Sequence, residues 1–347
     1  NAKYKLAKDM DGCKPRLTKK KQIVCKKAIH PLLRKKNSLE KKPTYGQDIE
    51  LNEAQRMLVI SGPNAGGKSI TLKTLGLLQM MVQSGFFVST EWENSFYVFD
   101  RILSEIGDNQ SIENELSTYS YRLQRMQTFL SVCNSKTLLL LDEFGTGSDP
   151  DLGGALAEAF FESFYQKEVF TVLTTHYNNI KSKAMELPHA INGCMLFNPD
   201  DLKPLFEFQT GSPGSSFTFE VAKNNGIPNQ ILKEAKKKLD KDKLNFNALL
   251  TDLQRKTNRL DDEIKRHRDE SKRYQEESEE FENHRSKLTR KYEKLNKTLQ
   301  TQEAELLAGK KMLQFVSAFK TSRGKKKNEA LMAEVLEYFK AQKTKKD

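Results

Sequence analysis

A glycine-rich run, GPNAGGKS at residues 62–69, is the clearest candidate for chemistry in this sequence. It matches the pattern Gly-x-x-x-x-Gly-Lys-Ser. Glycines let backbone N–H groups surround a phosphate, and the N-terminus of a following helix adds its positive dipole. The Lys of the pattern reaches the outer phosphates, and its Ser ligates Mg²⁺. The predicted nucleotide contacts are Gly62, Pro63, Asn64, Ala65, Gly66, Gly67, Lys68, Ser69 and Ile70.

Two carboxylates and a histidine follow later apolar runs. Asp142 and Glu143 come directly after KTLLLL, and His176 comes directly after FTVLTT. We expect Asp142 to complete the Mg²⁺ shell together with Ser69, and Glu143 to polarise the attacking water. His176 is expected to sense the terminal phosphate and to act in catalysis beside Glu143; a purely structural histidine is the alternative.

The segment ELSTYS, residues 115–120, precedes a helical run and supplies a hydroxyl at Ser117. A Ser at a helix start is usually just an N-cap. In ATPases of the ABC superfamily, the Ser at this position faces the nucleotide of a partner subunit, so that two subunits enclose two ATP molecules. The present chain has Leu-Ser-Thr-Tyr where that superfamily has Leu-Ser-Gly-Gly. We expect Ser117 and Thr118 to act in trans as such a signature.

The segments that must position these residues alternate between strands and helices. Continuous apolar strands separated by helical stretches predict a parallel sheet that is covered on both faces. Chemistry is expected at the carboxyl ends of such strands. A later pair of strands around NPDD is expected to form a hairpin at the edge of the sheet. The predicted elements are the strands 57–61, 136–141 and 170–175, a helix to about residue 83, and the hairpin strands 190–198 and 205–210.

The sequence changes character after Pro228. Residues 229–308 contain no Gly and no Pro, and they carry a 3-4 spacing that is apolar at both ends and polar in its middle. This pattern predicts a coiled coil, with a turn near 240–247 that would divide it into two helices; a single charged helix is the alternative. The seam comprises Phe246, Leu250, Leu253, Thr257, Leu260, Ile264, His267, Ser271, Tyr274, Ser278, Phe281, Arg285, Leu288, Tyr292, Leu295, Leu299, Gln302 and Leu306.

The charge divides the chain into an acidic middle and two basic flanks. Residues 1–44 hold 15 Lys and Arg against 3 Asp and Glu, residues 45–228 hold 12 against 22, and residues 229–347 hold 31 against 21. Basic flanks favour a polyanionic partner such as nucleic acid. Solvated lysine surfaces are the alternative.

Composition limits the class of protein. Of the 347 residues, 37% are apolar and 30% are charged, and mean hydropathy is -0.68, but 20 Phe and 10 Tyr argue against general disorder. No apolar run approaches the roughly 18 residues that cross a bilayer, and no signal peptide is recognisable, so no membrane partner is expected. The four cysteines form no Cys-x-x-Cys pair, which favours the cytoplasm. Zinc held by Cys13, Cys25 and His30 is the alternative to ordinary thiols.

Four blocks, GPNAGGKS, NELSTYS, LLLLDEFGTGSDP and TTHY, resemble in order the MutS family of DNA mismatch-recognition ATPases. A fifth block at 211–228 is similar to the closing segment of that family, with Gly214, Ser216 and Phe219 in a Gly-x-Ser-x-x-Phe pattern. The resemblance covers roughly residues 28–240. QSIENELSTYS, GSDPDLGGALAEA, AIHPLL and the coil directly after the ATPase region resemble the second bacterial branch of the family.

The resemblance implies ATP and Mg²⁺ as cofactors, a homodimer, and an ATP-driven cycle on mismatched or branched DNA. It implies suppression of homologous recombination or DNA repair in the bacterial cytoplasm at the nucleoid. An endonuclease in the complete protein, and a ribosome or rRNA partner, are implied as well. The DNA-encircling helices of the family should lie upstream, and its Leu-Asp-Leu-His-Gly-like nuclease motif is not found after residue 310. We therefore expect a fragment that hydrolyses ATP but does not itself cut DNA.

The expected fold is α/β, a P-loop ABC-type ATPase with a mixed, mainly parallel sheet, followed by a long α-helical coiled coil. The expected domains are a basic lead-in left from an upstream region (1–44), the MutS-type ATPase (45–228), the charged coiled coil (229–308) and a basic, partly disordered tail (309–347). An SMC-like ATPase head would insert its coil between Lys68 and Asp142, which are only 74 residues apart here. An ATP-gated dimeric scaffold and a ribosome-associated quality-control ATPase remain as alternatives.

Overall fold

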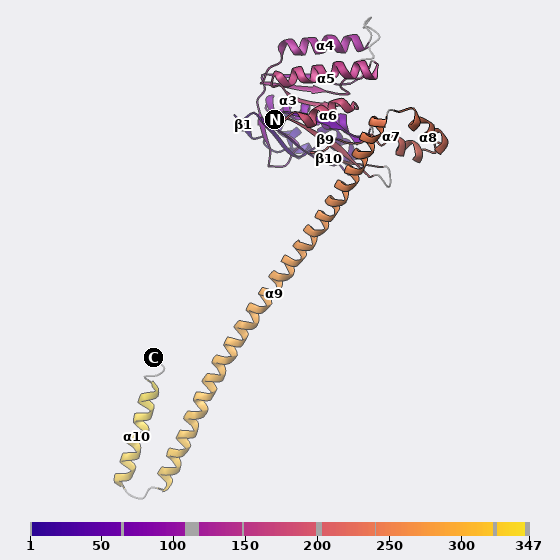
Figure 1. Cartoon of the computed structure of the whole chain (residues 1–347). Helices are drawn as coiled ribbons and strands as arrows, with labels where there is room; N and C mark the ends of the chain where they lie inside the picture. Colours follow the sequence, from indigo (N-terminus) through magenta and orange to yellow (C-terminus); the bar gives the residue numbers. More distant parts are fainter. Residues whose placement is uncertain are drawn as a thin grey trace. The chain divides into compact units, whose positions relative to one another are not determined.

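The chain divides into two compact units, residues 1–261 and residues 262–347, in a computed structural model (Figure 1). Each unit is described by itself. The structure describes residues 2–63, 66–107, 118–147, 149–198, 203–239, 241–321 and 325–343.

The central sheet of the first unit has six strands: β4 (Met57–Ser61), β6 (Arg101–Glu105), β7 (Thr137–Leu141), β8 (Phe170–Thr174), β9 (Ala190–Asn198) and β10 (Lys203–Thr210). Their order is β10-β9-β4-β8-β7-β6. All neighbours are parallel except β10, which runs antiparallel to β9 at the edge. The three predicted apolar strands, the edge hairpin and the mixed, mainly parallel sheet are therefore confirmed.

Helices cover both faces of this sheet: α3 (Lys68–Gln83), α4 (Thr118–Val132), α5 (Pro150–Gln166) and α6 (Asn178–Glu186). Alternate residues of a strand enter opposite faces of the sheet, so β7 contributes to two separate clusters. Leu140 packs in the cluster that contains the apolar side chains of α3, and Leu139 packs in the cluster that contains those of α4, α5 and α6. Gly76 lets α3 approach β7 closely, because a Cβ there would lie 2.5 Å from Cδ1 of Leu140.

A second sheet, which we did not predict, packs on the α3 side of the first unit. Its order is β1 (Leu17–Thr18), β5 (Ser95–Tyr97), β2 (Ile23–Ala28) and β3 (Gln47–Leu51). The residues before 45 also form α1 (Ala2–Asp9) and α2 (Pro31–Leu39). Apolar side chains of β2 join the same core cluster as β4 and α3. The segment that we expected to be a basic lead-in thus supplies part of the core, and β2 pairs with β3 across the boundary expected at residue 44.

In the described part of the chain, four helices follow the central sheet: α7 (Thr218–Asn224), α8 (Asn229–Lys237), α9 (Lys241–Thr321) and α10 (Lys325–Lys343). The break between α8 and α9 lies just before the turn predicted at 240–247. Helix α9 continues through Gly309, where we expected the coil to end, and α10 lies in the segment expected to be partly disordered. No described helix combines the length and the apolar composition that crossing a membrane requires.

The first turns of α9 belong to the core of the first unit. Leu250 and Gln254 are 2% and 3% exposed. Nε2 of Gln254 donates to the carbonyl of Met195 at 3.3 Å, and Nδ2 of Asn258 donates to the carbonyl of Phe197 at 3.0 Å. Leu250, an early member of the predicted seam, is therefore part of this core, whereas Leu253 is 41% exposed and Gln254 and Asn258 lie outside the seam. From Leu260 to Leu306 its large apolar members are exposed in the single chain.

Candidate functional site

The glycine-rich run joins the end of β4 to the start of α3, as its sequence predicted. Gly62 has φ +130° and Gly67 has φ +101°, and both values suit glycine because it lacks a Cβ. Gly67 stands at the N-cap of α3, so the run ends where the free N–H groups of the helix begin. Asn64 and Ala65 of the predicted contacts lie outside the described residues.

Lys68 is enclosed by this loop. It is 4% exposed, and its Nζ donates to the carbonyls of Gly62 at 2.9 Å and Pro63 at 3.0 Å. Burial lowers the pKa of Lys68 to about 8, although Glu143 and Asp142 act in the opposite direction. The structure thus holds a buried cation whose partners are backbone carbonyls, and an anion would stabilise its charged form.

The side chain of Asp142 accepts hydrogen bonds from two hydroxyl groups. Oγ of Ser69 donates to its Oδ1 at 2.9 Å, and Oγ1 of Thr174 donates to the same oxygen at 2.6 Å. The sequence predicted that Ser69 and Asp142 lie together, and the structure brings them together. A hydroxyl and a carboxylate are oxygen ligands of the kind that Mg²⁺ prefers, so this pair fits the ion.

Glu143 follows in a left-handed backbone conformation, with φ +49°. Its N–H donates to Oγ1 of Thr174 at 2.8 Å, and the N–H of Phe144 donates to the carbonyl of Thr174 at 2.8 Å. A non-glycine residue in this region is strained and persists only where surrounding bonds fix it. The Glu143 side chain is exposed at the end of β7, where a base could reach a bound substrate.

His176 lies two residues beyond the end of β8. Burial, together with the smaller effect of the positive charges of Lys68 and Lys181, lowers the pKa of His176 to about 4. The imidazole is therefore neutral at pH 7 and can donate or accept a hydrogen bond, but it carries no charge. The electrostatic effect of Lys68 on His176 indicates that the two side chains lie near one another.

The predicted trans-signature is only partly described. Ser117 lies outside the described residues, and Thr118 is the first residue of α4. Their contacts therefore remain predictions.

Two residues of this region were missed by the sequence analysis. Thr174 was part of the run before His176, but its type alone gave no sign that it would bond both Asp142 and the backbone of Glu143. Lys181, in α6, is 1% exposed, and its Nζ donates to Oδ1 of Asn178 at 3.3 Å and to the carbonyl of Gly214 at 3.2 Å. Burial and the charge of Lys68 lower the pKa of Lys181 to about 8.

A cavity of about 410 Å³ opens beside the start of α3, and the sequence gave no signal for it. Its lining includes Gly67, Ile70 and Thr71 and the rings of Tyr45 and Phe206. These two rings are stacked, with centroids 6.1 Å apart. Phe206 has φ +55° and sits at an irregularity in the pairing of β10 with β9. An aromatic cavity next to the glycine-rich loop suits a flat nitrogen heterocycle.

The first two cysteines lie in the interior. Cys13 and Cys25 belong to the core cluster of the second sheet, and the nearest hydrogen-bond partners of the Cys13 thiol are Thr90 and Asn94. Burial raises the pKa of the Cys25 thiol far above its ordinary value, with a further contribution from Cys13. Among the described residues no group of three or more His, Cys, Asp or Glu side chains is placed to hold a metal ion.

Comparison with known proteins gives two kinds of similarity. The family model for MutS domain V matches residues 58–243. Endonuclease MutS2 of Lactiplantibacillus plantarum is 38% identical over 263 residues, which are 76% of this chain and 33% of that protein. Endonuclease MutS2 of Leuconostoc mesenteroides is 36% identical over 267 residues, with 77% and 32% covered. That of Alkaliphilus metalliredigens is 38% identical over 265 residues, with 76% and 33% covered. The chain spans about a third of the length of these relatives.

Proposed function

Because the chain belongs to the MutS family, as the match to domain V over more than half of its length shows, we propose that it binds and hydrolyses ATP. The hydrolysis would take place at composite sites of a homodimer and would drive a conformational cycle on DNA. The observation that carries this proposal is the hydrogen bond between Ser69 and Asp142. It joins the phosphate-binding loop to the strand end that bears Glu143.

In this proposal Lys68 and the N–H groups at the start of α3 bind the phosphates of ATP. Lys68 would exchange its two present carbonyl acceptors for phosphate oxygens, which form stronger charge-assisted bonds with its ammonium group. Ser69 and Asp142 would hold Mg²⁺, which when bound neutralises charge on the β- and γ-phosphates. Thr174 keeps the Asp142 carboxylate oriented.

Glu143 is the proposed general base. Its backbone is fixed by Thr174, so its carboxylate starts from a defined position at the end of β7. A water molecule between this carboxylate and the terminal phosphate would be polarised for attack. Neutral His176 would bond the terminal phosphate without adding a charge that the two nearby lysines would oppose.

The cavity lined by Tyr45 and Phe206 is the proposed position of the nucleobase. It adjoins Gly67 and Ile70, so a nucleotide whose phosphates lie on the loop has its base beside these rings. Replacing Tyr45 with Ala should weaken ATP binding by about five- to a hundredfold, because a base–aromatic stacking contact contributes about 1–3 kcal/mol. Binding of inorganic triphosphate should be unchanged.

DNA, mismatched or branched, is the proposed macromolecular partner. The chain is basic at both ends, and the curated relatives that it matches carry the name endonuclease MutS2. We propose a role in DNA repair or in the suppression of recombination in the bacterial cytoplasm. The endonuclease activity in the relatives' name is proposed for the whole protein, not for this third of it. An ATP-gated scaffold and a ribosome-associated ATPase are the competing functions.

Single-turnover hydrolysis separates an ATP-driven cycle from a scaffold. The protein is held in excess over radiolabelled ATP with Mg²⁺, and phosphate release is followed with no nucleic acid, with branched DNA, or with ribosomes. DNA should change the hydrolysis rate at least threefold, and Glu143→Gln should abolish hydrolysis in every arm. ATP binding without hydrolysis would favour a scaffold, and stimulation by ribosomes alone would favour the ribosomal function.

A further inference from the structure

The five residues 143–147 form a tight loop whose shape depends on backbone conformations that are costly or need glycine. Glu143, Gly145 and Gly147 have φ +49°, +92° and +106°. Gly145 is closely enclosed, since a Cβ there would lie 2.7 Å from the ring of Tyr177. The position of the Glu143 carboxylate therefore depends on the bonds that hold this loop at each end.

The backbone N–H of Glu143 is bonded to β8, and the backbone carbonyl of Glu143 is bonded to Thr146. Oγ1 of Thr146 donates to the carbonyl of Glu143 at 2.8 Å, and the N–H of Thr146 donates to the same carbonyl at 3.1 Å. Together with the bond from its N–H to Thr174, these bonds fix both sides of the strained residue. Thr146 is thus the residue that secures Glu143 from the far side of the loop.

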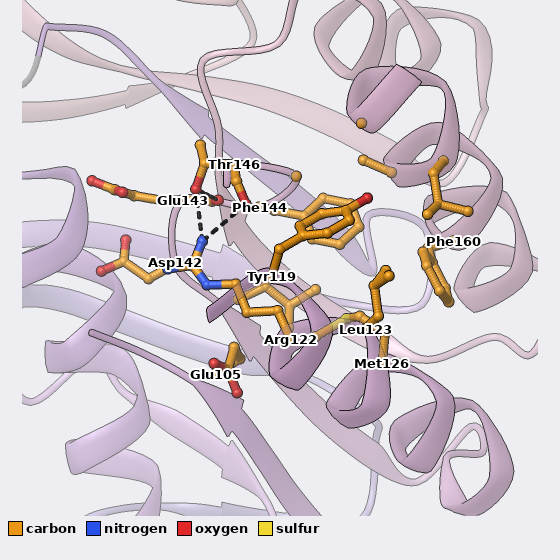
Figure 2. A pocket seen from close by; sticks show the side chains of 15 residues that line it. Glu105, Tyr119, Arg122, Leu123, Met126, Asp142, Glu143, Phe144, Thr146 and Phe160 are labelled. Atoms are coloured by element: carbon orange, nitrogen blue, oxygen red, sulfur yellow. Dashed lines mark hydrogen bonds between the residues drawn. The ribbon is translucent and has the colours of Figure 1, made fainter. Parts of the chain in front are cut away.

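Arg122, in the first turns of α4, bonds Thr146 from outside the loop. Its Nη1 donates to Oγ1 of Thr146 at 2.7 Å and to the carbonyl of Thr146 at 3.3 Å. Figure 2 shows the guanidinium of Arg122 reaching Thr146, while the Glu143 carboxylate points away from it. A hydroxyl that accepts from a guanidinium is polarised, and this strengthens the bond that it donates in turn to Glu143.

A small cavity of about 40 Å³ lies beside this bond, between α4 and α5. It is lined by Arg122, by the carboxylates Glu105, Asp142 and Glu143, and by apolar side chains that include Leu123, Met126 and Phe160 (Figure 2). A hydrogen bond at the edge of such a cavity is less weakened by water than one on the open surface. The link between α4 and the loop is therefore expected to persist while α4 moves.

We propose that Arg122 is a positioning residue that couples helix α4 to the general base Glu143 through Thr146. This rests on the proposed function. Helix α4 begins directly after Ser117, which is proposed to meet the ATP of the partner subunit. Engagement of that ATP would shift α4, and the shift would pass through Arg122 and Thr146 to Glu143 of the same chain. Each site would then hydrolyse ATP at a rate that depends on the occupancy of the other.

The first experiment separates hydrolysis from binding. Arg122→Ala and Thr146→Val should each lower the single-turnover hydrolysis rate about ten- to a hundredfold, because a small displacement of a catalytic group has effects of this size. The dissociation constant of ATP should stay within twofold. Arg122→Lys and Thr146→Ser should recover much of the rate, and the double variant should be no slower than the slower single variant. Multiplying effects in the double variant would overturn the coupling.

Arg101→Ala is the matched control. Nη1 of Arg101 donates to the carbonyl of Val132 at 3.3 Å, so it also binds α4, but at the end farthest from the loop. Its hydrolysis rate should equal that of the unmodified protein. Thermal unfolding of every variant shows whether a lower rate follows from lost folding. If Arg122→Ala and Arg101→Ala both fold and both lower the hydrolysis rate equally, α4 is only a structural support.

A mixing experiment tests the direction of the coupling. Ser117→Arg subunits mixed with Glu143→Gln subunits should regain part of the hydrolysis, because one site of the mixed dimer has both an intact Glu143 and an intact Ser117. The rate of that site should stay below that of an unmodified site, because α4 of the chain that supplies Glu143 no longer engages the partner's ATP. Arg122→Ala mixed with Glu143→Gln should regain none, because Arg122 acts on Glu143 of its own chain. Recovery of hydrolysis in the second mixture would overturn the proposal, because it would show that Arg122 acts on the ATP bound by the partner subunit. Failure of the unmodified protein to bind ATP would instead reject the proposed function.

Discussion

Oγ of Ser69 donates a hydrogen bond of 2.9 Å to Oδ1 of Asp142, and this bond joins the first turn of α3 to the end of β7. The two residues are 73 positions apart in the sequence. Thr174, from the neighbouring strand β8, donates to the same oxygen. A helix and two strands therefore meet at one carboxylate, and the nucleotide proposal depends on that meeting point.

Lys68→Ala and Glu143→Gln should fail in different ways. Loss of Lys68 should weaken ATP binding about ten- to a hundredfold, because its bonds to phosphate are charge-assisted. Glu143→Gln should bind ATP normally and lose turnover, since only the activation of water is removed. Fluorescent ATP binding and phosphate release measure the two quantities. An equal loss of binding in both variants would contradict the assigned roles.

The composite site predicts that hydrolysis depends on protein concentration. If Ser117 acts in trans, Lys68→Ala subunits mixed with Ser117→Arg subunits should form dimers with at most one working site. Turnover of the mixture should exceed that of either variant alone and stay below half of the unmodified rate. Undiminished turnover by a monomer at nanomolar concentration would exclude this arrangement.

Truncation should separate nucleotide binding from DNA binding, and the structure decides where to cut. Residues 262–347 hold 22 Lys and Arg against 16 Asp and Glu. A chain ending at residue 261 should bind ATP normally and bind DNA more weakly, with a shallower dependence on salt, because fewer counterions are released. A chain ending at residue 228 should be less stable, because it loses buried Leu250 and Gln254. If the dependence of DNA affinity on salt concentration is the same in the 261-residue chain, the lysines of residues 262–347 do not contact DNA.

Lys181 predicts a pH dependence of stability. Its pKa in the folded protein is about 8, below the ordinary 10.5, so the unfolded chain binds the proton more tightly. Below pH 8 the folded state carries the full cost of a buried, protonated Lys181. This cost disappears as the amine loses its proton, so the free energy of unfolding should rise from pH 8 to 10.5, by at most about 3 kcal/mol. Urea unfolding at several pH values should show this rise in the unmodified protein and a smaller one in Lys181→Met.

Lys183→Met supplies the control for that measurement. Lys183 bonds Glu162 and Glu186, and its pKa is raised, so it stays charged in the folded state across this pH range and in the unfolded state until the pH approaches 10.5. Its variant should retain the full rise with pH. If the free energy of unfolding rises equally with pH in Lys181→Met and in the unmodified protein, the buried Lys181 amine does not titrate as described.

The chain should leave plasmid and branched DNA intact in Mg²⁺ or Mn²⁺. A nuclease needs metal ligands or a positioned base and nucleophile. The carboxylates and histidine that follow β7 and β8 (Asp142, Glu143 and His176) are proposed to act on ATP. Agarose gels of supercoiled plasmid measure nicking. Metal-dependent nicking that survives Glu143→Gln and stringent purification would reveal a second active site.

The sequence by itself determined the strands, the glycine-rich loop and the residues that end β7 and β8. Short continuous apolar runs that alternate with helices are typical of buried parallel strands. The carboxyl ends of such strands lie at the same edge of the sheet. Ser69, Asp142 and His176 could therefore be placed near one another before any coordinates, because their positions follow from local pattern and strand direction. Helix α3 also began and ended where its sequence indicated.

Only the tertiary structure decided which ordinary residues support that site. Thr174, Arg122 and Lys181 belong to common types, and no spacing marks them, because their contacts depend on strand register and on the packing of α4 and α6. Tyr45 and Phe206 are 161 positions apart, and they stack where the pairing of β10 with β9 is irregular and Phe206 has a left-handed backbone conformation. Local pattern specifies secondary structure and strand ends, whereas contacts of this kind arise from the summed packing of distant segments, which no single segment encodes.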